Sequence, residues 1–125
     1  MSNEKVTGLA RFYYATCYSF KGMRAAFVHE PAFRYEIYAS LLLLPASFWV
    51  ASSAMGLAML MSSCLLVLMA ELVNSAIEAV VDRAGLEVNE LAGRAKDLGS
   101  AAVFVTLLIA GLVWSAALWE KLMAG

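Results

Sequence analysis

Four polar side chains recur at helical spacing in the middle of the chain, directly after an apolar run from Met55 to Met69. These side chains are Glu71, Asn74, Glu78 and Asp82. If one helix continues through the run and beyond it, a period of 3.6 residues puts all four on one narrow stripe. Carboxylates at membrane depth are costly unless they face a protein interior or a watery cavity, where they usually mark a functional site. The stripe is therefore the candidate site of chemistry.

Other charged side chains can join this stripe. Two further acids, Glu30 and Glu36, are expected at similar membrane depth, and a polar segment after the stripe supplies Arg83, Arg94, Lys96 and Asp97. Mg²⁺ prefers one or two carboxylates together with substrate phosphates and water. Basic side chains neutralise phosphate oxygens, and a desolvated carboxylate can accept a proton from an alcohol. This inventory suits a metal–nucleotide complex; the alternative is interhelical salt bridging without chemistry.

Asn74 also has two interpretations: it can orient a carboxylate or phosphate, or it can form an interhelical hydrogen bond.

The known sequence motifs narrow the enzyme classes. The chain has no GxxxxGK[ST] motif, no Gly-rich phosphate loop, and no HExxH, GxSxG or CxxC. P-loop kinases and the commoner hydrolase and redox classes are therefore excluded.

The composition points to a membrane protein of one domain, residues 1–125. Hydrophobic residues make up 62% of the chain, and the mean hydropathy is +0.75. A soluble domain of 125 residues lacks the interior volume to bury so much apolar surface. The net charge of −1 argues against nucleic acid as a partner. Cys17 and Cys64 match no disulfide or metal pattern and are interpreted as free thiols.

Hydrophobic patterning predicts an all-α fold with three membrane spans and one surface helix. The N-terminal helix, about 5–30, combines an aromatic stripe with basic residues, which is typical of a helix on the membrane surface; packing on protein is the alternative. Pro31 should separate this helix from the first span, about 35–53. The second span, about 55–82, carries the stripe into a cytoplasmic extension, and the third covers about 98–119.

The distribution of basic residues predicts the topology. Lys and Arg occur in the N-terminal helix and between the second and third spans, but not between the first and second. By the positive-inside rule the N-terminus and the second loop are cytoplasmic, and the first loop and the C-terminus are external. We expect no removable signal peptide. Small residues on the later spans favour association with other copies; they are Ser75, Ala76, Ala79, Ser100, Ala101 and Ala102.

Four stretches resemble the bacterial integral-membrane diacylglycerol kinase family. They are residues 18–26 (YSFKGMRAA), 30–34 (EPAFR), 71–83 (ELVNSAIEAVVDR) and 93–103 (GRAKDLGSAAV), so the resemblance covers nearly the whole chain. It implies a homotrimeric kinase of the bacterial cytoplasmic (inner) membrane, with three spans and a surface helix in each subunit. Such an enzyme transfers the γ-phosphoryl group of MgATP to diacylglycerol and produces phosphatidic acid.

The resemblance also implies roles for individual residues. Glu71 matches the general base, and Glu30 and Glu78 match the residues that hold Mg²⁺ on the ATP phosphates. The matching ATP-binding set is Arg11, Tyr18, Glu30, Glu78, Glu87, Lys96 and Asp97. The matching active-site surround is Arg11, Asn74 and Ser100.

The chain departs from the family pattern at Pro31, where relatives often have Ala, and at Asn89, where His is common. Two other functions remain alternatives. Undecaprenol kinases share the Asn-x-Ala-Ile-Glu core, although residues 74–75 and 99–103 look more like the diacylglycerol branch. A non-catalytic membrane subunit could use the same acids as an ion relay or in assembly, but a relay would spread acids across the full membrane depth, and these acids cluster at one interface.

Overall fold

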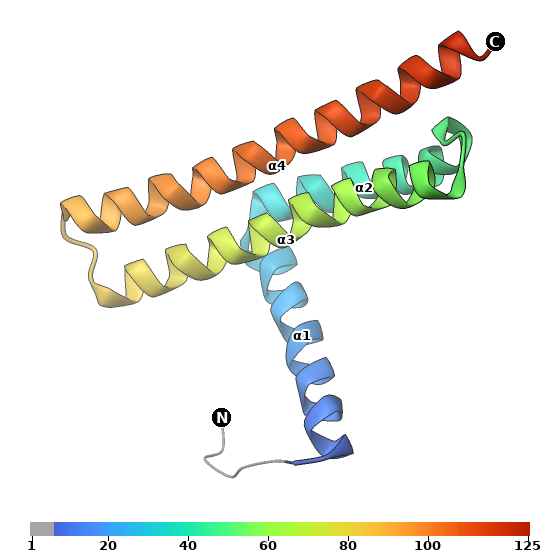
Figure 1. The fold of residues 1–125 in the computed structure, drawn as a ribbon. Helices are drawn as coiled ribbons and strands as arrows, with labels where there is room; N and C mark the ends of the chain where they lie inside the picture. Colours follow the sequence, from blue (N-terminus) through green and yellow to red (C-terminus); the bar gives the residue numbers. More distant parts are fainter. Residues whose placement is uncertain (1–6) are drawn as a thin grey trace.

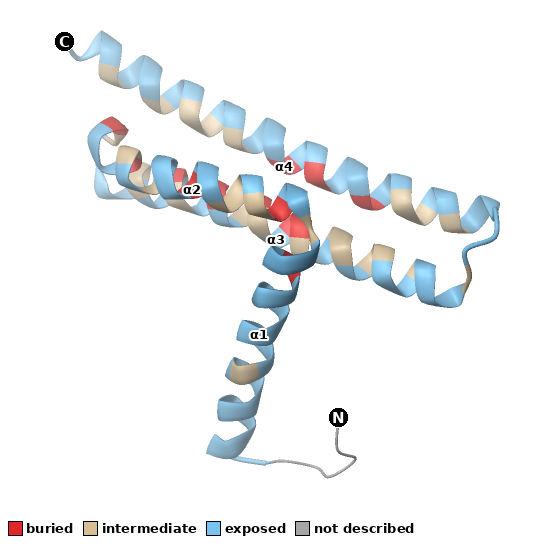
Figure 2. Cartoon of the chain, turned by 180° about the vertical axis from the view of Figure 1, so that it is seen from behind, coloured by how far each residue is buried: buried red, intermediate tan, exposed pale blue. Residues whose placement is uncertain are grey.

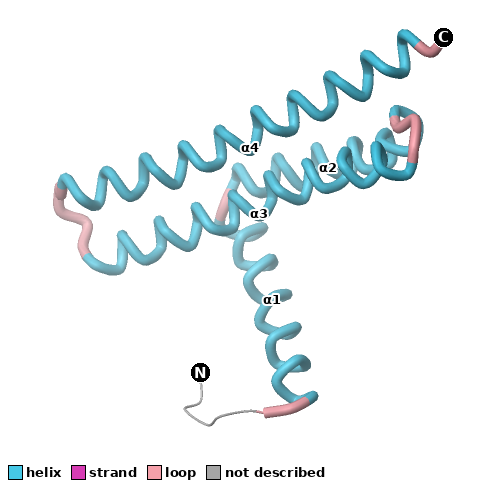
Figure 3. Tube along the Cα trace, viewed as in Figure 1, coloured by secondary structure: helices cyan, strands magenta, loops and turns pink. Residues whose placement is uncertain are grey.

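The computed structural model describes residues 7–125, and all regular secondary structure in that range is helical (Figures 1 and 3). The helices are α1 (Leu9–His29), α2 (Pro31–Val50), α3 (Ala54–Ala84) and α4 (Glu90–Met123). The predicted all-α fold is confirmed for this part of the chain. Lys5, at the expected start of the surface helix, lies outside the described residues.

Local chemistry explains where the helices begin and end. Glu30 is extended, with φ −115° and ψ 102°, because the ring of Pro31 disfavours the α conformation in the residue before it. Pro31 then starts α2, where its missing N–H costs no hydrogen bond. Ser53 and Asn89 cap α3 and α4 by accepting hydrogen bonds from backbone N–H groups of their first turns. The predicted break at Pro31 is therefore confirmed, and α1 runs through Gly22 uninterrupted.

Three helices lie side by side, and α1 stands apart from them. α4 runs back along α3 after a short connection, residues 85–89, and α2 lies along the first part of α3 (Figure 1). α1 leaves this bundle steeply in both views (Figures 1 and 2). Its one buried residue is Ala26, whereas Phe12, Tyr13 and Phe20 are 71%, 66% and 65% exposed. Within the described part of the chain, these three aromatic side chains therefore do not pack on protein, whereas Phe27, at the other end of α1, packs edge-to-face on Tyr38 of α2.

Two of the described helices, α3 and α4, are long and apolar enough to cross a membrane. Among the described helices α2 does not meet this criterion, and two charged residues, Arg34 and Glu36, lie in its first turns. The predicted apolar run 37–54 also extends past the helix, which ends at Val50. The helical part, residues 37–50, rises only about 21 Å against about 30 Å for a bilayer core. Two spans therefore have structural support, and the third remains a prediction.

Most of the polar segment between the second and third spans is helical. α3 continues to Ala84 and α4 begins at Glu90, so α4 is longer than the expected span 98–119 at both ends. Arg94 and Lys96 consequently lie on the first turns of α4 rather than in a loop. A helix holds these charges in defined positions beside α3.

Small side chains allow the bundle helices to approach closely. Ser40 and Ser47 of α2 and Ser63 of α3 are buried. Figure 2 shows that the buried positions of the bundle lie mainly on the sides where its helices face one another. Ser63 Oγ donates to a carbonyl of its own helix at 2.7 Å and accepts from Nε1 of Trp114 at 3.1 Å, so its polarity is satisfied. The small residues expected to mediate association are instead exposed or half-buried; they are Ser75, Ala76, Ala79, Ser100, Ala101 and Ala102.

Candidate active site

The polar stripe lies on one continuous helix, as its spacing predicts. α3 carries Glu71, Asn74, Glu78 and Asp82 without interruption, and burial is greatest at Glu71 and least at Asp82. Glu71 is 7% exposed, Asn74 and Glu78 are half-buried, and Asp82 is exposed. The stripe therefore leads from the protein interior to solvent at the end of α3.

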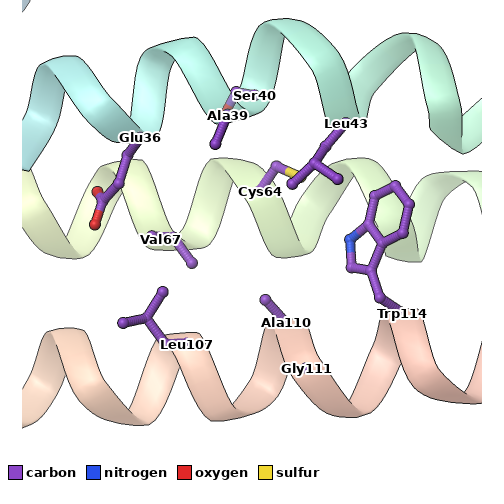
Figure 4. A pocket seen from close by; sticks show the side chains of 10 residues that line it. All are labelled: Glu36, Ala39, Ser40, Leu43, Cys64, Val67, Leu107, Ala110, Gly111 and Trp114. Carbon is purple, nitrogen blue, oxygen red and sulfur yellow. The ribbon is translucent and has the colours of Figure 1, made fainter.

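Glu71 contacts a second acid, Glu36 of α2. Oε2 of Glu36 is buried and has no hydrogen-bond partner among the described residues. Ionised carboxylates only accept hydrogen bonds, so this contact becomes a hydrogen bond only when one of the pair holds a proton. Glu36 also borders an otherwise largely apolar cavity of about 270 Å³ between α2, α3 and α4, with Trp114 at the opposite end (Figure 4).

Asn74 turns its amide group toward Glu78. Nδ2 of Asn74 donates to Oε1 of Glu78 at 3.5 Å, one turn along the same helix. Oδ1 of Asn74 is buried, faces Gly99 of α4, and accepts no hydrogen bond from the residues that the structure describes. The hydrogen bond between Asn74 and Glu78 lies within α3 and does not join two helices. Of the two interpretations of Asn74, the one in which it orients a carboxylate is therefore favoured.

One ion pair joins the stripe to α4. Nζ of Lys96 lies 2.7 Å from Oδ1 of Asp82, and the two side chains are 43% and 48% exposed. The hydrogen bond and the charge of Asp82 raise the pKa of Lys96, so its ammonium group is charged at neutral pH. Within residues 7–125 the other ion pair is Arg94–Glu90, on the surface of α4. Interhelical salt bridging therefore explains Asp82 but not the other acids of the stripe.

The variants Asp82→Asn and Lys96→Gln separate the structural role of this pair from a chemical one. Exposed ion pairs contribute little to stability, so thermal unfolding should be nearly unchanged in both variants. If Lys96 binds phosphate, Lys96→Gln alone should raise the KM for ATP, by about tenfold for a lost charge-assisted contact. ATP titrations of both variants measure this difference, and an equal rise in both would favour the salt-bridge interpretation.

Glu30 occupies the break between α1 and α2 and borders a groove of about 680 Å³ between α1 and α3. The α3 side of this groove is lined by Leu72, Ser75, Ala76 and Ala79. On a helical wheel these residues are adjacent to the stripe. Glu30 therefore lies beside the face of α3 that is next to the face carrying Glu78. No three acidic, histidine or cysteine side chains within residues 7–125 are arranged to hold a metal ion. Two carboxylates are still a set that Mg²⁺ accepts when phosphates and water complete the shell.

Several residues expected to bind nucleotide gather at the solvent end of the stripe. Glu87 and Lys96 line a concavity of about 260 Å³ around the connection between α3 and α4. Asp97 and Ser100 are exposed on the first turns of α4. This end of the bundle can therefore present both carboxylates and an ammonium group to a metal–nucleotide complex.

The α1 residues are not all brought to the same place. Tyr18 precedes Ser19, which lines the groove beside Glu30. Arg11 lies about two turns further out, in the first turn of α1, which points away from the bundle (Figure 1). A single chain therefore does not bring Arg11 to the stripe.

Sequence reasoning assigned no role to two residues that shape this site. In the sequence Glu36 is only an acid of similar membrane depth, and no local pattern predicts its contact with Glu71 on another helix. Gly99 faces Asn74; its only sequence signal is an isolated glycine in a helical segment, which often has a packing reason. Asn89, a departure from the family pattern in the sequence analysis, has a clear structural role as the N-cap of α4.

Comparison with known proteins identifies the family. A profile described as prokaryotic diacylglycerol kinase matches residues 17–118. The chain is 49% identical over 120 residues to the diacylglycerol kinase of Escherichia coli, covering 96% of this chain and 98% of the relative. It is 46% identical over 115 residues to that of Haemophilus influenzae, covering 92% and 98%. It is 46% identical over 109 residues to that of Pseudomonas aeruginosa, covering 87% and 89%.

The matched region includes most of α1 and nearly all of the bundle, and with them the acidic stripe and the lysine that pairs with it. The resemblance seen in the sequence is thereby confirmed, and the chain belongs to the prokaryotic diacylglycerol kinase family.

Proposed function

We propose that this chain is a lipid kinase that transfers the γ-phosphoryl group of MgATP to the hydroxyl of diacylglycerol, giving phosphatidic acid and ADP. The observation that carries the proposal is Glu71, a buried acid without a basic partner in the described structure, at the end of the apolar part of a helix long enough to span a membrane. The relatives named diacylglycerol kinase support the lipid substrate.

Glu71 serves as the general base in this mechanism. The lipid hydroxyl oxygen attacks the γ-phosphorus, the bond to the oxygen bridging the β- and γ-phosphates breaks, and ADP leaves. Glu71 takes the hydroxyl proton as the new bond forms. Phosphoryl transfer has a loose transition state, so holding the hydroxyl and the phosphate in line contributes as much as the base.

Mg²⁺ enters with ATP as part of the substrate. Glu30 and Glu78 each give one carboxylate to the ion, and the phosphates and water supply the remaining oxygens. Asn74 supports this assignment because its amide restrains Glu78. The cation of Lys96 offsets phosphate charge, and the other residues assigned to the nucleotide and to the active-site surround are Arg11, Tyr18, Glu87, Asp97 and Ser100.

The active form in this proposal is a homotrimer in the bilayer. Two features support association: the aromatic side chains of α1 and the small residues of α3 and α4 are exposed in the single chain. Association would also give Arg11 a route to the acidic stripe of a neighbouring copy. Native mass spectrometry should find three times the chain mass of 13.5 kDa; a dominant monomer that retains activity would contradict the trimer.

The membrane topology is part of the same proposal. α2 completes three spans in the bacterial cytoplasmic membrane, with the N-terminus inside and the C-terminus outside. Cysteine introduced at Lys96 or at Gly125, after replacement of Cys17 and Cys64, can be labelled with a membrane-impermeant maleimide. The Gly125 variant should label in cells with a permeabilised outer membrane, and the Lys96 variant only in inside-out vesicles; the reverse pattern would invert the topology.

The decisive test of function is a phosphotransfer assay on the purified protein. With MgATP and a panel of diacylglycerol, undecaprenol and other lipid alcohols, we expect phosphatidic acid as the dominant product. Phosphorylation of undecaprenol instead would assign the related lipid kinase activity. ATP-independent cation flux in proteoliposomes, without any phospholipid product, would favour a relay subunit.

A further inference from the structure

α4 passes α3 at Gly99 with no room for a side chain. Gly99, Val103 and Thr106 are the buried residues of α4, spaced at helical intervals on the face turned toward α3. A Cβ atom at position 99 would overlap Oδ1 of Asn74 and lie 3.4 Å from its Cγ. The next neighbour, Cδ1 of Ile77, is at an ordinary distance of 3.6 Å. Asn74 is therefore the residue that makes glycine necessary here.

The amide of Asn74 has one favourable orientation in this space. Nδ2 donates to the carboxylate of Glu78, and Oδ1 points toward Gly99. If the amide were flipped, its oxygen would face the Glu78 carboxylate, and two acceptors would oppose each other. Glu78 thus selects the orientation, and the missing Cβ at Gly99 makes it sterically possible.

We propose that Gly99 is a positioning residue for the metal–nucleotide site. The absence of a Cβ lets Asn74 stay turned toward Glu78, and Asn74 in turn keeps the Glu78 carboxylate oriented for the divalent ion that arrives with ATP. This inference rests on the proposed role of Glu78. Groups that only orient a metal ligand still govern metal affinity, because they fix its direction and hold it ready.

Gly99→Ala should change the site without unfolding the protein. The atom that meets the new Cβ is the end of a short, rotatable side chain rather than backbone. Asn74 therefore rotates away from Glu78 while the α3–α4 packing persists. Alanine is also the better helix former, which offsets part of the packing cost. The expected defect lies in metal binding rather than in folding.

Binding of Mn²⁺, a spectroscopically visible substitute for Mg²⁺, tests this directly. With a non-hydrolysable ATP analogue present, electron paramagnetic resonance should show Gly99→Ala binding Mn²⁺ about tenfold more weakly than the wild type. Gly111→Ala is the matched control on the same helix, because a Cβ there meets no described atom within 4 Å; its Mn²⁺ affinity should be unchanged. Unchanged affinity in Gly99→Ala would overturn the proposal.

Steady-state kinetics give a second readout. Gly99→Ala should raise the Mg²⁺ concentration for half-maximal rate while kcat at saturating Mg²⁺ is largely retained. A role in packing alone would lower kcat or the folded fraction and leave the Mg²⁺ dependence unchanged, which would also overturn the proposal.

A double-mutant cycle shows whether Gly99 acts through Asn74. In an Asn74→Ala background, where the atom that meets the new Cβ is gone, Gly99→Ala should weaken Mn²⁺ binding no further. Additive losses would show that Gly99 acts by another route. The Mn²⁺ measurements need no lipid, so they test this inference separately from the kinase activity. If the double-mutant cycle gives the expected result but the protein phosphorylates no lipid, the kinase proposal is wrong and this inference is not affected. If the wild type binds no Mn²⁺ with the nucleotide, this inference fails by itself.

Discussion

Glutamine in place of Glu71 should lower the rate of diacylglycerol phosphorylation by about 10²- to 10⁴-fold. Glutamine keeps the size of the side chain but cannot accept the hydroxyl proton. The fold should survive, because the new amide can donate to the buried oxygen of Glu36 that has no partner in the described structure. Turnover with MgATP and diacylglycerol in mixed micelles, together with thermal unfolding, measures both expectations.

Glu90→Gln is the matched control for this experiment. The Glu90 side chain is 91% exposed and pairs only loosely with Arg94, at 3.8 Å, so its loss should leave the rate near that of the wild type. Phosphoryl transfer can proceed without strong base catalysis, so the pH profile matters as well as the rate. A Glu71→Gln protein that binds MgATP and turns over normally across the pH range would make Glu71 a structural acid.

Glu30→Gln and Glu78→Gln should each raise the Mg²⁺ concentration needed for half-maximal rate by at least about tenfold, since even groups that merely orient a ligand contribute about 10- to 100-fold to metal affinity. The two residues are far apart in sequence, so similar defects in both would indicate a shared ion. Mg²⁺ titrations at fixed ATP measure the shift.

Folding and assembly must be checked in the same preparations. Neither variant should lose its oligomeric state, because neither acid forms an ion pair in the described structure. Glu90→Gln again serves as the control, with an unchanged Mg²⁺ requirement. If both variants keep wild-type Mg²⁺ dependence, the metal lies elsewhere and the shared-coordination assignment is wrong.

Local rules were enough to predict the elements of this fold. The spacing of Glu71, Asn74, Glu78 and Asp82 predicts one stripe because helical periodicity is a property of neighbouring residues. The break before Pro31 follows from the steric effect of a proline ring on the residue before it.

The ends of the helices were harder to predict from hydropathy. Residues 82–97 are polar, and polarity indicates contact with water rather than the absence of a helix. α3 nevertheless continues to Ala84, and α4 starts at Glu90 because Asn89 caps it. Apolar character likewise indicates burial or contact with lipid and does not mark the end of a helix. The apolar run 37–54 therefore does not reveal that α2 stops at Val50.

By itself, the sequence determined the membrane character, the helical stripe and the family of this protein, because these depend on composition, periodicity and matching motifs. Only the tertiary structure decided which side chains meet: Glu36 with Glu71, Lys96 with Asp82, and Gly99 with Asn74. Each pair joins different helices, and its contact depends on which faces the helices turn toward one another. That choice is made by packing across the whole bundle, where small residues permit close approach, and no local pattern encodes it.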